Sequence, residues 1–219
     1  MACNVICQSR KNMTEIRFKE LGLVEYSETY EAMMLLIESQ PGFHSIWSLE
    51  HFPVFTIGIS EKEITEDKLK TPPFIKTDRG GKTTFHAPGQ QVFYFILNMK
   101  KLPFPPTDLT KKILETTSSV LASYDLKHNI NAHDPGIFIE KQKVASIGMR
   151  IKKNYSYHGL SINIETDLDT FNSIKPCGLD VQACNLKDYI DINVVNVPGP
   201  AINGKAIGTT DAVLGLLSL

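Results

Sequence analysis

Three strand-like segments that follow one another between residues 136 and 164 constrain the fold of this chain more than any other feature. Short polar turns at 141–142 and 152–155 separate these segments, which cover residues 136–140, 143–151 and 156–164. Such spacing predicts hairpin-like connections within one sheet. Two stretches with helical periodicity, at 27–39 and 107–124, lie outside this run. Helices that flank such a sheet predict an α+β fold, or an α/β fold with a mixed sheet.

Both predicted helices have expected cap residues and an apolar face. Ser27 is the expected N-cap of the first helix, and Pro41-Gly42 ends it. Thr107 is the expected N-cap of the second helix. The apolar faces, which we expect to pack into the core, contain Tyr30, Met33, Met34 and Ile37 in the first helix and Leu109, Ile113, Val120 and Tyr124 in the second.

Further strands are expected in the first half of the chain, at 14–19 and 91–97. Residues 45–50 and 54–58, on either side of Pro53, predict a pair of strands. The chain has 219 residues, of which 42% are hydrophobic, which is enough apolar material for one real core. We therefore assign residues 1–219 to a single domain.

The charge and the cysteine content exclude several classes of partner. A formal net charge of −1 gives no global field to attract nucleic acid or an anionic membrane, so we expect neither as a partner. The apolar runs are too short to span a bilayer, and the N-terminal residues do not resemble a secretory signal. The four cysteines have no zinc-site spacing, so we expect no metal and free thiols in a reducing cytoplasm.

Residues 79–90 form a glycine-rich segment with the sequence RGGKTTFHAPGQ. Gly80 and Gly81 let the backbone approach a ligand closely and point its amides inward. Arg79 can anchor the loop, and His86 adds an ionisable group. The segment is not a phosphate-binding P-loop, because the glycine that the pattern requires five residues before Gly81-Lys82-Thr83 is missing and Lys76 stands there. Taken alone, it fits a simple turn as well as a binding loop.

Two of the strand-like segments contain small residues. Residues 143–150 have the sequence KVASIGMR, and residues 157–164 have the sequence YHGLSINI. Small residues clustered on a strand leave room for something to lie against it. From these residues alone, Lys143 fits a surface lysine and His158 fits a packed histidine.

Cys177 lies between Pro176 and Gly178, in a loop of constrained shape. A thiol in such a loop can project into a cleft, whereas a core cysteine normally has apolar neighbours at helical or strand spacing. An inert loop thiol is the alternative interpretation. Cys184 is expected to be structural.

These segments, taken together and in this order, resemble the octanoyl-[acyl carrier protein]:protein N-octanoyltransferase family, also called lipoyl(octanoyl) transferases or lipoate-protein ligase B. The resemblance rests on the patterns RGGxxTxHxPGQ, KxASxG, HGL and PCG, and it runs from about residue 52 to about residue 186. The combination is highly specific, although no single pattern would be. Ala87 stands where the family often has glycine, and the tail at 193–219 remains unassigned.

The resemblance implies a single α/β domain related to biotin and lipoate ligases, without a cofactor of its own. It implies that Cys177 is the acyl-thioester nucleophile. It also implies that Lys143 lowers the pKa of that thiol and handles protons; an ammonium within about 4–6 Å can lower such a pKa by about 1–3 units. His158 would be a pocket neighbour. The implied substrate-binding residues are Arg79, Gly80, Gly81, Lys82, Thr83, Thr84, Phe85, His86, Ser146, Ile147, Gly148, Gly159, Leu160 and Ser161.

The implied reaction transfers an octanoyl group from octanoyl-acyl carrier protein to a lysine of an apo lipoyl domain, the first step of endogenous protein lipoylation. The implied acceptors are the lipoyl domains of 2-oxoacid dehydrogenase complexes and the glycine cleavage H protein. Making an amide from a thioester is downhill, so no ATP is required. Four basic residues are candidates to receive these acidic partners: Lys141, Arg150, Lys152 and Lys153. We expect a monomer.

Three other functions remain open at this point. An ATP-dependent lipoate or biotin ligase shares the fold but needs no cysteine nucleophile. An amidotransferase of the same superfamily would move octanoyl groups between protein lysines and would also use a cysteine and a lysine. A non-enzymatic binder of acylated carrier protein would keep its function when Cys177 is replaced by serine.

Overall fold

The computed structural model describes residues 15–61, 72–131, 133–173 and 181–191. It contains two long helices and ten strands within these residues. The elements in chain order are β1 (Ile16–Val24), α1 (Tyr26–Glu38), β2 (His44–His51), β3 (Val54–Ile57), β4 (Phe74–Lys76), β5 (Thr84–His86), β6 (Gln90–Ile96), η1 (Met99–Lys101), η2 (Pro106–Asp108), α2 (Leu109–Ala122), β7 (Asn129–Asn131), β8 (Gly136–Ile139), β9 (Gln142–Lys152), β10 (Tyr155–Asn163), α3 (Leu168–Ser173) and η4 (Leu186–Asp188).

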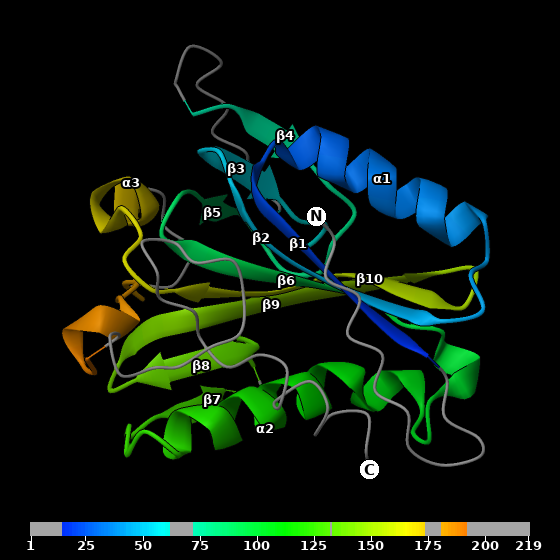
Figure 1. Ribbon diagram of the computed structural model, residues 1–219. Helices are drawn as coiled ribbons and strands as arrows, with labels where there is room; N and C mark the ends of the chain where they lie inside the picture. Colours follow the sequence, from blue (N-terminus) through cyan, green and yellow to red (C-terminus); the bar gives the residue numbers. More distant parts are fainter. Residues whose placement is uncertain (1–14, 62–71, 132, 174–180, 192–219) are drawn as a thin grey trace.

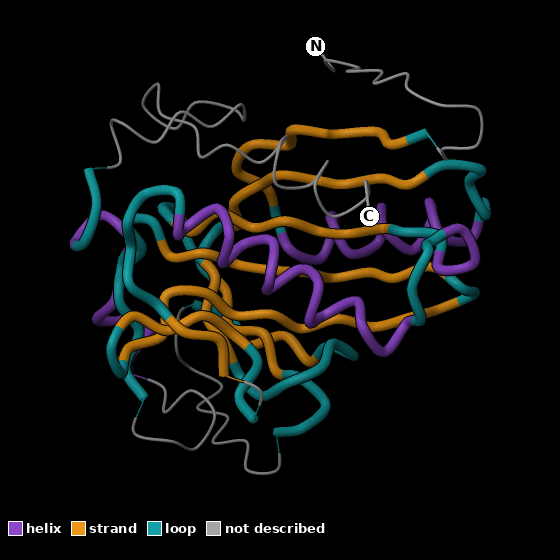
Figure 2. Tube along the Cα trace, turned by 90° about the horizontal axis from the view of Figure 1, so that it is seen from below, coloured by secondary structure: helices purple, strands orange, loops and turns teal. Residues whose placement is uncertain are grey.

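Seven strands form a mixed sheet in the order β1-β2-β6-β10-β9-β8-β7, and Figure 2 shows them running side by side. Strands β1 and β2 pair in parallel, whereas every other neighbouring pair in this sheet is antiparallel. The expected run of β8, β9 and β10 is confirmed. Lys153 and Asn154, which join β9 to β10, have φ values of 50° and 66°. A two-residue hairpin turn of type I′ needs positive φ at both central residues.

The two long helices cover opposite faces of this sheet (Figure 1). Met33 and Ile37 of α1 pack on one face against β2, β6 and β10. Leu109 and Ile113 of α2 pack on the other face. The predicted mixed sheet flanked by helices is therefore confirmed. Of the remaining predicted core positions on α2, Val120 and Tyr124 are only partly buried; Leu114 and Leu121 are buried instead.

Both N-cap predictions were wrong. Helix α1 has Glu25 as its N-cap, and Thr29 already donates its backbone N–H to the Glu25 carbonyl, so Ser27 lies inside the first turn. Helix α2 has Asp108 as its N-cap, because the 3₁₀ turn η2 starts the winding earlier and includes Thr107. Pro106 is the first residue of η2, and the ring of proline fixes φ near the helical value, which favours this early start.

The predicted pairing of residues 45–50 with residues 54–58 was also wrong. Both segments form strands, but β2 joins the large sheet between β1 and β6, whereas β3 lies in a second sheet of order β4-β3-β5. The Phe52-Pro53 step therefore passes the chain from one sheet to the other. This small sheet positions the glycine-rich loop, because residues 77–83 connect β4 to β5.

Candidate functional site

A cavity of about 240 Å³ lies between the large sheet and the glycine-rich loop, mainly on the sheet face that packs against α1. Its lining also includes Thr110 of α2 and two residues that pack with the core on the α2 side, Ile147 and Leu160. Its walls come from β6, β9 and β10, from the loop at 79–84, and from the segment that follows residue 180. The structure brings together here all but two of the residues predicted for the site: Arg79, Gly80, Gly81, Lys82, Thr83, Thr84, His86, Lys143, Ser146, Ile147, Gly148, Gly159, Leu160 and Ser161.

Phe85 does not line the cavity. Successive side chains of a strand point to opposite faces, so Thr84 and His86 of β5 face the cavity while Phe85 turns away. Its ring is buried against Phe55 and Phe171, at centroid distances of 4.9 and 6.3 Å. Phe85 is therefore a packing residue of the small sheet. The other predicted residue that is not in the wall, Cys177, lies outside the described residues.

Small residues on β9 and β10 form a smooth strip in the cavity wall. Ser146 lies directly opposite Ser161, and Gly148 lies directly opposite Gly159. Gly80 of the loop lies against this strip, and a Cβ atom on Gly148 would be 2.8 Å from the Gly80 carbonyl oxygen. The strip therefore lets the loop approach the sheet closely.

Gly148→Ala is expected to destabilise the protein by about 1–3 kcal/mol, because the added methyl group displaces the backbone of the loop at Gly80. Urea unfolding measures this change. Gly42→Ala is the matched control, since a Cβ atom there meets nothing within 4 Å, and its effect should stay within about 0.5 kcal/mol. Equal stability of the two variants would contradict the proposed close contact.

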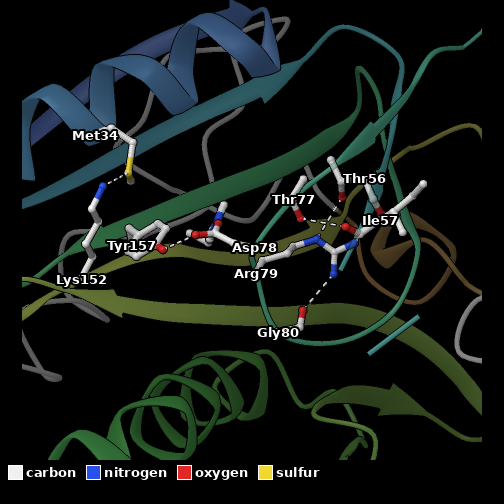
Figure 3. Close-up of polar contacts among 10 residues, drawn as sticks. Met34, Thr56, Ile57, Thr77, Asp78, Arg79, Gly80, Lys152 and Tyr157 are labelled. Atoms are coloured by element: carbon white, nitrogen blue, oxygen red, sulfur yellow. Dashed lines mark hydrogen bonds and ion pairs between the residues drawn. The ribbon is translucent and has the colours of Figure 1, made fainter. Parts of the chain in front are cut away.

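Arg79 anchors the glycine-rich loop to the small sheet (Figure 3). Its guanidinium donates from Nε to Thr56 Oγ1 at 3.0 Å, from Nη2 to the Thr56 carbonyl at 2.5 Å, and from Nη1 to the Gly80 carbonyl at 3.0 Å. The side chain is buried. The planar guanidinium group of arginine can donate hydrogen bonds to several acceptors at fixed positions, so it holds the loop in one conformation before any ligand binds.

Asp78 ties the same loop to β10. Its carboxylate accepts hydrogen bonds from the Tyr157 hydroxyl and from His158 Nε2, the latter at 2.9 Å (Figure 3 shows the Tyr157 contact). Burial alone would raise the pKa of Asp78, but these two hydrogen bonds outweigh it and lower the pKa. Burial also lowers the pKa of His158, despite the neighbouring carboxylate. At neutral pH the imidazole is therefore neutral, and His158 acts as a loop anchor rather than as an acid or base.

A buried chain of hydrogen bonds leads from His86 to the backbone of Lys143. His86 Nδ1 lies 2.6 Å from Gln90 Oε1, and burial lowers the pKa of His86 to about 3, so the neutral ring donates from Nδ1. Gln90 Nε2 then donates to Asn163 Oδ1 at 2.9 Å. Asn163 Nδ2 donates to the carbonyl of Cys184 at 3.2 Å and to that of Lys143 at 3.5 Å. This series of hydrogen bonds therefore links β5 and β6, through β10, to β9 and to the segment that follows residue 180.

A β-bulge decides which face of the sheet Lys143 occupies. Strand β8 pairs Ile137 with Ala145 but its next residue, Phe138, with Lys143, so Val144 is an extra residue on β9. Val144 and Ala145 are neighbours in sequence, yet both pack into the core on the α2 face. Lys143 consequently shares the cavity face with Ser146. A regular strand would place Lys143 on the face of Ala145; bulges commonly re-aim a side chain in this way.

The Lys143 side chain is buried and ion-paired within the cavity. Its Nζ lies 2.7 Å from Asp134 Oδ1, and the two side chains are only 10% and 13% exposed. Its Nζ also lies 5.4 Å from the centre of the Phe138 ring. The stem fits a notch left by Gly136, where a Cβ atom would be 2.4 Å from Lys143 Cε. No sequence motif had indicated Asp134.

The chain returns to Lys143 directly after the segment that contains Cys177. Lys143 donates its backbone N–H to the Gln182 carbonyl at 2.9 Å, and Cys184 donates its own to the Lys143 carbonyl at 3.1 Å. Val181 and Ala183 line the cavity. Cys184 is 3% exposed, and burial raises the pKa of its thiol to about 11, as befits a structural cysteine.

Two of the four basic residues proposed as a docking surface are engaged within the protein. Lys152 Nζ lies 3.4 Å from Glu38 on α1, and Lys153 also contacts the Glu38 carboxylate. Lys141 and Arg150 are exposed. The charge offered to a partner at residues 150–153 is therefore smaller than the sequence suggests.

Several cavity residues were missed by the sequence analysis. Tyr26 comes from the start of α1, and Val92 and Tyr94 come from β6. Alternation along the predicted strand could have placed Val92 and Tyr94 on one face, but not which face. The other missed lining residues are Thr110, Asp134, Pro135, Met149, Phe171, Val181 and Ala183. His158, which the family resemblance placed beside the pocket, also lines it.

Within the residues that the structure describes, no group of three or more histidine, cysteine, aspartate or glutamate side chains could hold a metal ion. No helix in the same part of the chain is long and apolar enough to cross a membrane.

Comparison with solved structures shows which fold this is. Lipoate-protein ligase A with bound ATP superposes with a TM-score of 0.66 at 16% identity, covering 92% of this chain and 81% of the other. The bipartite lipoate protein ligase from Thermoplasma acidophilum gives a TM-score of 0.64 at 14% identity, covering 94% and 81%. At such low identity these similarities establish the fold alone.

Comparison with sequences shows the family. Residues 28–198 match the lipoyl protein ligase A/B catalytic domain. An octanoyltransferase from Wigglesworthia glossinidia brevipalpis is 36% identical over 87% of this chain and 90% of its own length. An octanoyltransferase from Chromobacterium violaceum is 37% identical over 90% and 91%, and one from Pseudomonas putida is 40% identical over 74% and 76%. The chain therefore belongs to the octanoyltransferase family, within the lipoyl protein ligase A/B catalytic domains.

Proposed function

We propose that this protein transfers an octanoyl group from octanoyl-acyl carrier protein to a lysine of an apo lipoyl domain, through a thioester on Cys177 and without ATP. The observation that carries the proposal is the convergence of the glycine-rich loop, Lys143 and the small residues of β9 and β10 on one cavity. The glycine-rich loop lies far from β9 and β10 in the sequence, and the transfer requires an acyl pocket beside a proton-handling group.

Cys177 is close in sequence to the cavity wall, because only three residues separate it from Val181, which lines the wall. Directly after Val181, residues 182–184 pair with the backbone of Lys143. This connection supports a nucleophile that works beside Lys143.

In the first step the Cys177 thiolate attacks the carbonyl carbon of the donor thioester. The new bond joins that carbon to Cys177 Sγ, and the bond to the sulfur of the carrier's phosphopantetheine arm breaks. The proton that left the Cys177 thiol is returned, by way of Lys143, to the departing carrier thiolate. A thioester replaces a thioester, so the step needs little driving force.

In the second step the amine of the acceptor lysine attacks the carbonyl carbon of the octanoyl-enzyme. The C–N bond forms, the C–S bond to Cys177 breaks, and Lys143 takes the proton that the amine loses and passes it to the cysteine sulfur. The product amide lies lower in energy than the thioester. That difference drives the transfer, so no nucleotide is consumed.

The apolar part of the cavity suits a medium-length acyl chain. Val92, Ile147, Leu160 and Phe171 provide apolar wall, and the glycine pair of β9 and β10 leaves space beside them. At about 0.8 kcal/mol per buried CH₂ group, the seven carbons beyond the carbonyl can contribute roughly 5 kcal/mol of binding free energy. Such a contribution would favour octanoyl over short acyl chains.

Intact-mass measurement after brief incubation with octanoyl-acyl carrier protein, without ATP or acceptor, tests the proposal. We expect an octanoyl-sized mass gain on the wild type that survives denaturation and is released by hydroxylamine. Cys177→Ala should show no gain. Cys184→Ala is the matched control and should acquire the adduct, because that thiol is buried and its pKa is raised to about 11.

The acceptor half of the reaction is tested by adding an apo lipoyl domain to the isolated octanoyl-enzyme. The octanoyl group should move to the lysine of the domain, again without ATP. An adduct that persists in Cys177→Ala would refute Cys177 as the nucleophile. Transfer that requires ATP and free octanoate would instead identify a ligase, and preference for an octanoylated lipoyl domain as donor would identify an amidotransferase.

A further inference from the structure

Lys143 is held in the cavity by a carboxylate that belongs to none of the recognised sequence patterns. The Lys143 Nζ to Asp134 Oδ1 distance is 2.7 Å, and both side chains are largely withdrawn from solvent. Both residues line the cavity. A charge removed from water in this way needs a partner of opposite sign.

We propose that Asp134 is a positioning residue for the transfer reaction: its carboxylate holds the Lys143 ammonium at the point where protons are exchanged with the reacting sulfur and amine. The inference rests on the proposed function of Lys143. It extends the cysteine–lysine pair to three groups, in which the third orients the proton-handling group without touching the reacting atoms.

Lysine needs such an orienting group more than histidine does. Its charge sits at the end of a flexible four-carbon stem, so the ammonium has no fixed position of its own. Here the stem passes through the notch at Gly136, and the ammonium lies 5.4 Å from the centre of the Phe138 ring. Neither contact fixes the direction of the N–H bonds. The Asp134 carboxylate, at hydrogen-bond distance, does so.

Asp134 is itself held in place by its surroundings. Asn131 Oδ1 accepts the backbone N–H of His133 at 2.8 Å and that of Asp134 at 3.2 Å. Pro135 follows directly and restricts the backbone of Asp134. The carboxylate is thus presented from a short turn that leads into β8 and is fixed before the substrate arrives.

Chemical rescue distinguishes this role from a packing role. Asp134→Ala leaves space for a small carboxylate, whereas Asp134→Asn keeps the shape and removes the charge. In single-turnover acylation by octanoyl-acyl carrier protein, we expect both variants to be slower than wild type by about 10- to 100-fold at saturating donor. The donor concentration for half-maximal rate should stay within about twofold. Added sodium formate should restore Asp134→Ala, and it should not restore Asp134→Asn.

Glu38→Ala is the control, because Glu38 also pairs with lysines but lies on the surface. It should acylate at the wild-type rate, with or without formate. Wild-type rates in both Asp134 variants would overturn the inference. A second pattern would also overturn the inference: Asp134→Ala is slow and formate does not improve it, while Asp134→Asn is fully active. That pattern indicates that the side chain serves only for packing.

A crystal structure of Asp134→Asn provides a readout that does not depend on the reaction. We expect Lys143 Nζ to leave its wild-type position by about 1 Å or more. An unmoved Lys143 would overturn the inference even if the proposed function is correct. A wild-type protein that forms no octanoyl adduct, with a displaced Lys143 in the variant, would refute the proposed function and leave the orienting contact established.

Discussion

Replacing Lys143 with methionine is expected to slow octanoyl transfer by about 100- to 10,000-fold, the range that a positioned acid–base group contributes. Methionine keeps a long unbranched side chain in the notch at Gly136 but can neither stabilise a thiolate nor exchange protons. The rates of adduct formation and of its transfer to a lipoyl domain are measured separately by intact mass. A variant that performs both steps at the wild-type rate would exclude Lys143 from the chemistry.

The same substitution also removes the ion-pair partner of a nearly buried carboxylate. Breaking a buried pair from one side costs about 3–5 kcal/mol, so a loss of activity in Lys143→Met alone could reflect a loss of folded protein. The double variant Lys143→Met with Asp134→Asn removes both charges. It should recover most of the stability and none of the activity, which separates the chemical role of the lysine from its structural one.

Gly159→Ala is expected to destabilise the protein by about 4 kcal/mol, a value that single substitutions seldom reach. A Cβ atom on Gly159 would lie 1.8 Å from the Phe93 carbonyl oxygen and 2.8 Å from its carbon. Those atoms belong to β6, the strand that pairs with β10 in the middle of the large sheet. Neither strand can move away without breaking the backbone hydrogen bonds between β6 and β10, and both hydrophobic cores pack against these strands. The loop opposite Gly148, in contrast, can move.

Urea unfolding of Gly159→Ala and Gly148→Ala, measured in parallel, gives a controlled comparison. The two glycines face each other across β9 and β10, so the strand propensity of alanine affects both alike. A larger loss at Gly159 isolates the cost of pushing β6 and β10 apart. Equal losses, or a loss below about 1 kcal/mol at Gly159, would show that the two strands shift freely.

The sequence was sufficient to predict those parts of the fold that depend on local spacing. The run of β8, β9 and β10 follows from turns too short to allow any other connection, and α1 and α2 follow from their apolar periodicity. Likewise, the pattern of small residues on β9 and β10 was correctly associated with a space beside these strands. The family was recognisable because four short patterns occur in a fixed order.

Features that depend on tertiary structure could not be predicted. The separation of β2 and β3 into different sheets depends on which partner each strand finds, and the short strands β4, β5 and β7 have too few residues to show a period. Asp134 lies in a turn with no recognised pattern, and only the folded chain brings its carboxylate to Lys143. The role of Cys177 remains a prediction.

The extra residue at Val144 has a consequence for how the protein tolerates change. The number of residues between Lys143 and Ala145 on β9 decides on which face of the sheet the Lys143 side chain lies. Substituting Val144 by another apolar residue leaves the number of residues unchanged. Deleting it removes the bulge but keeps Lys143 on the cavity face, because Lys143 then directly precedes Ala145 and regular alternation places the two side chains on opposite faces. An added residue beside a retained bulge would instead turn Lys143 toward α2, so this stretch tolerates a deletion at Val144 better than an insertion.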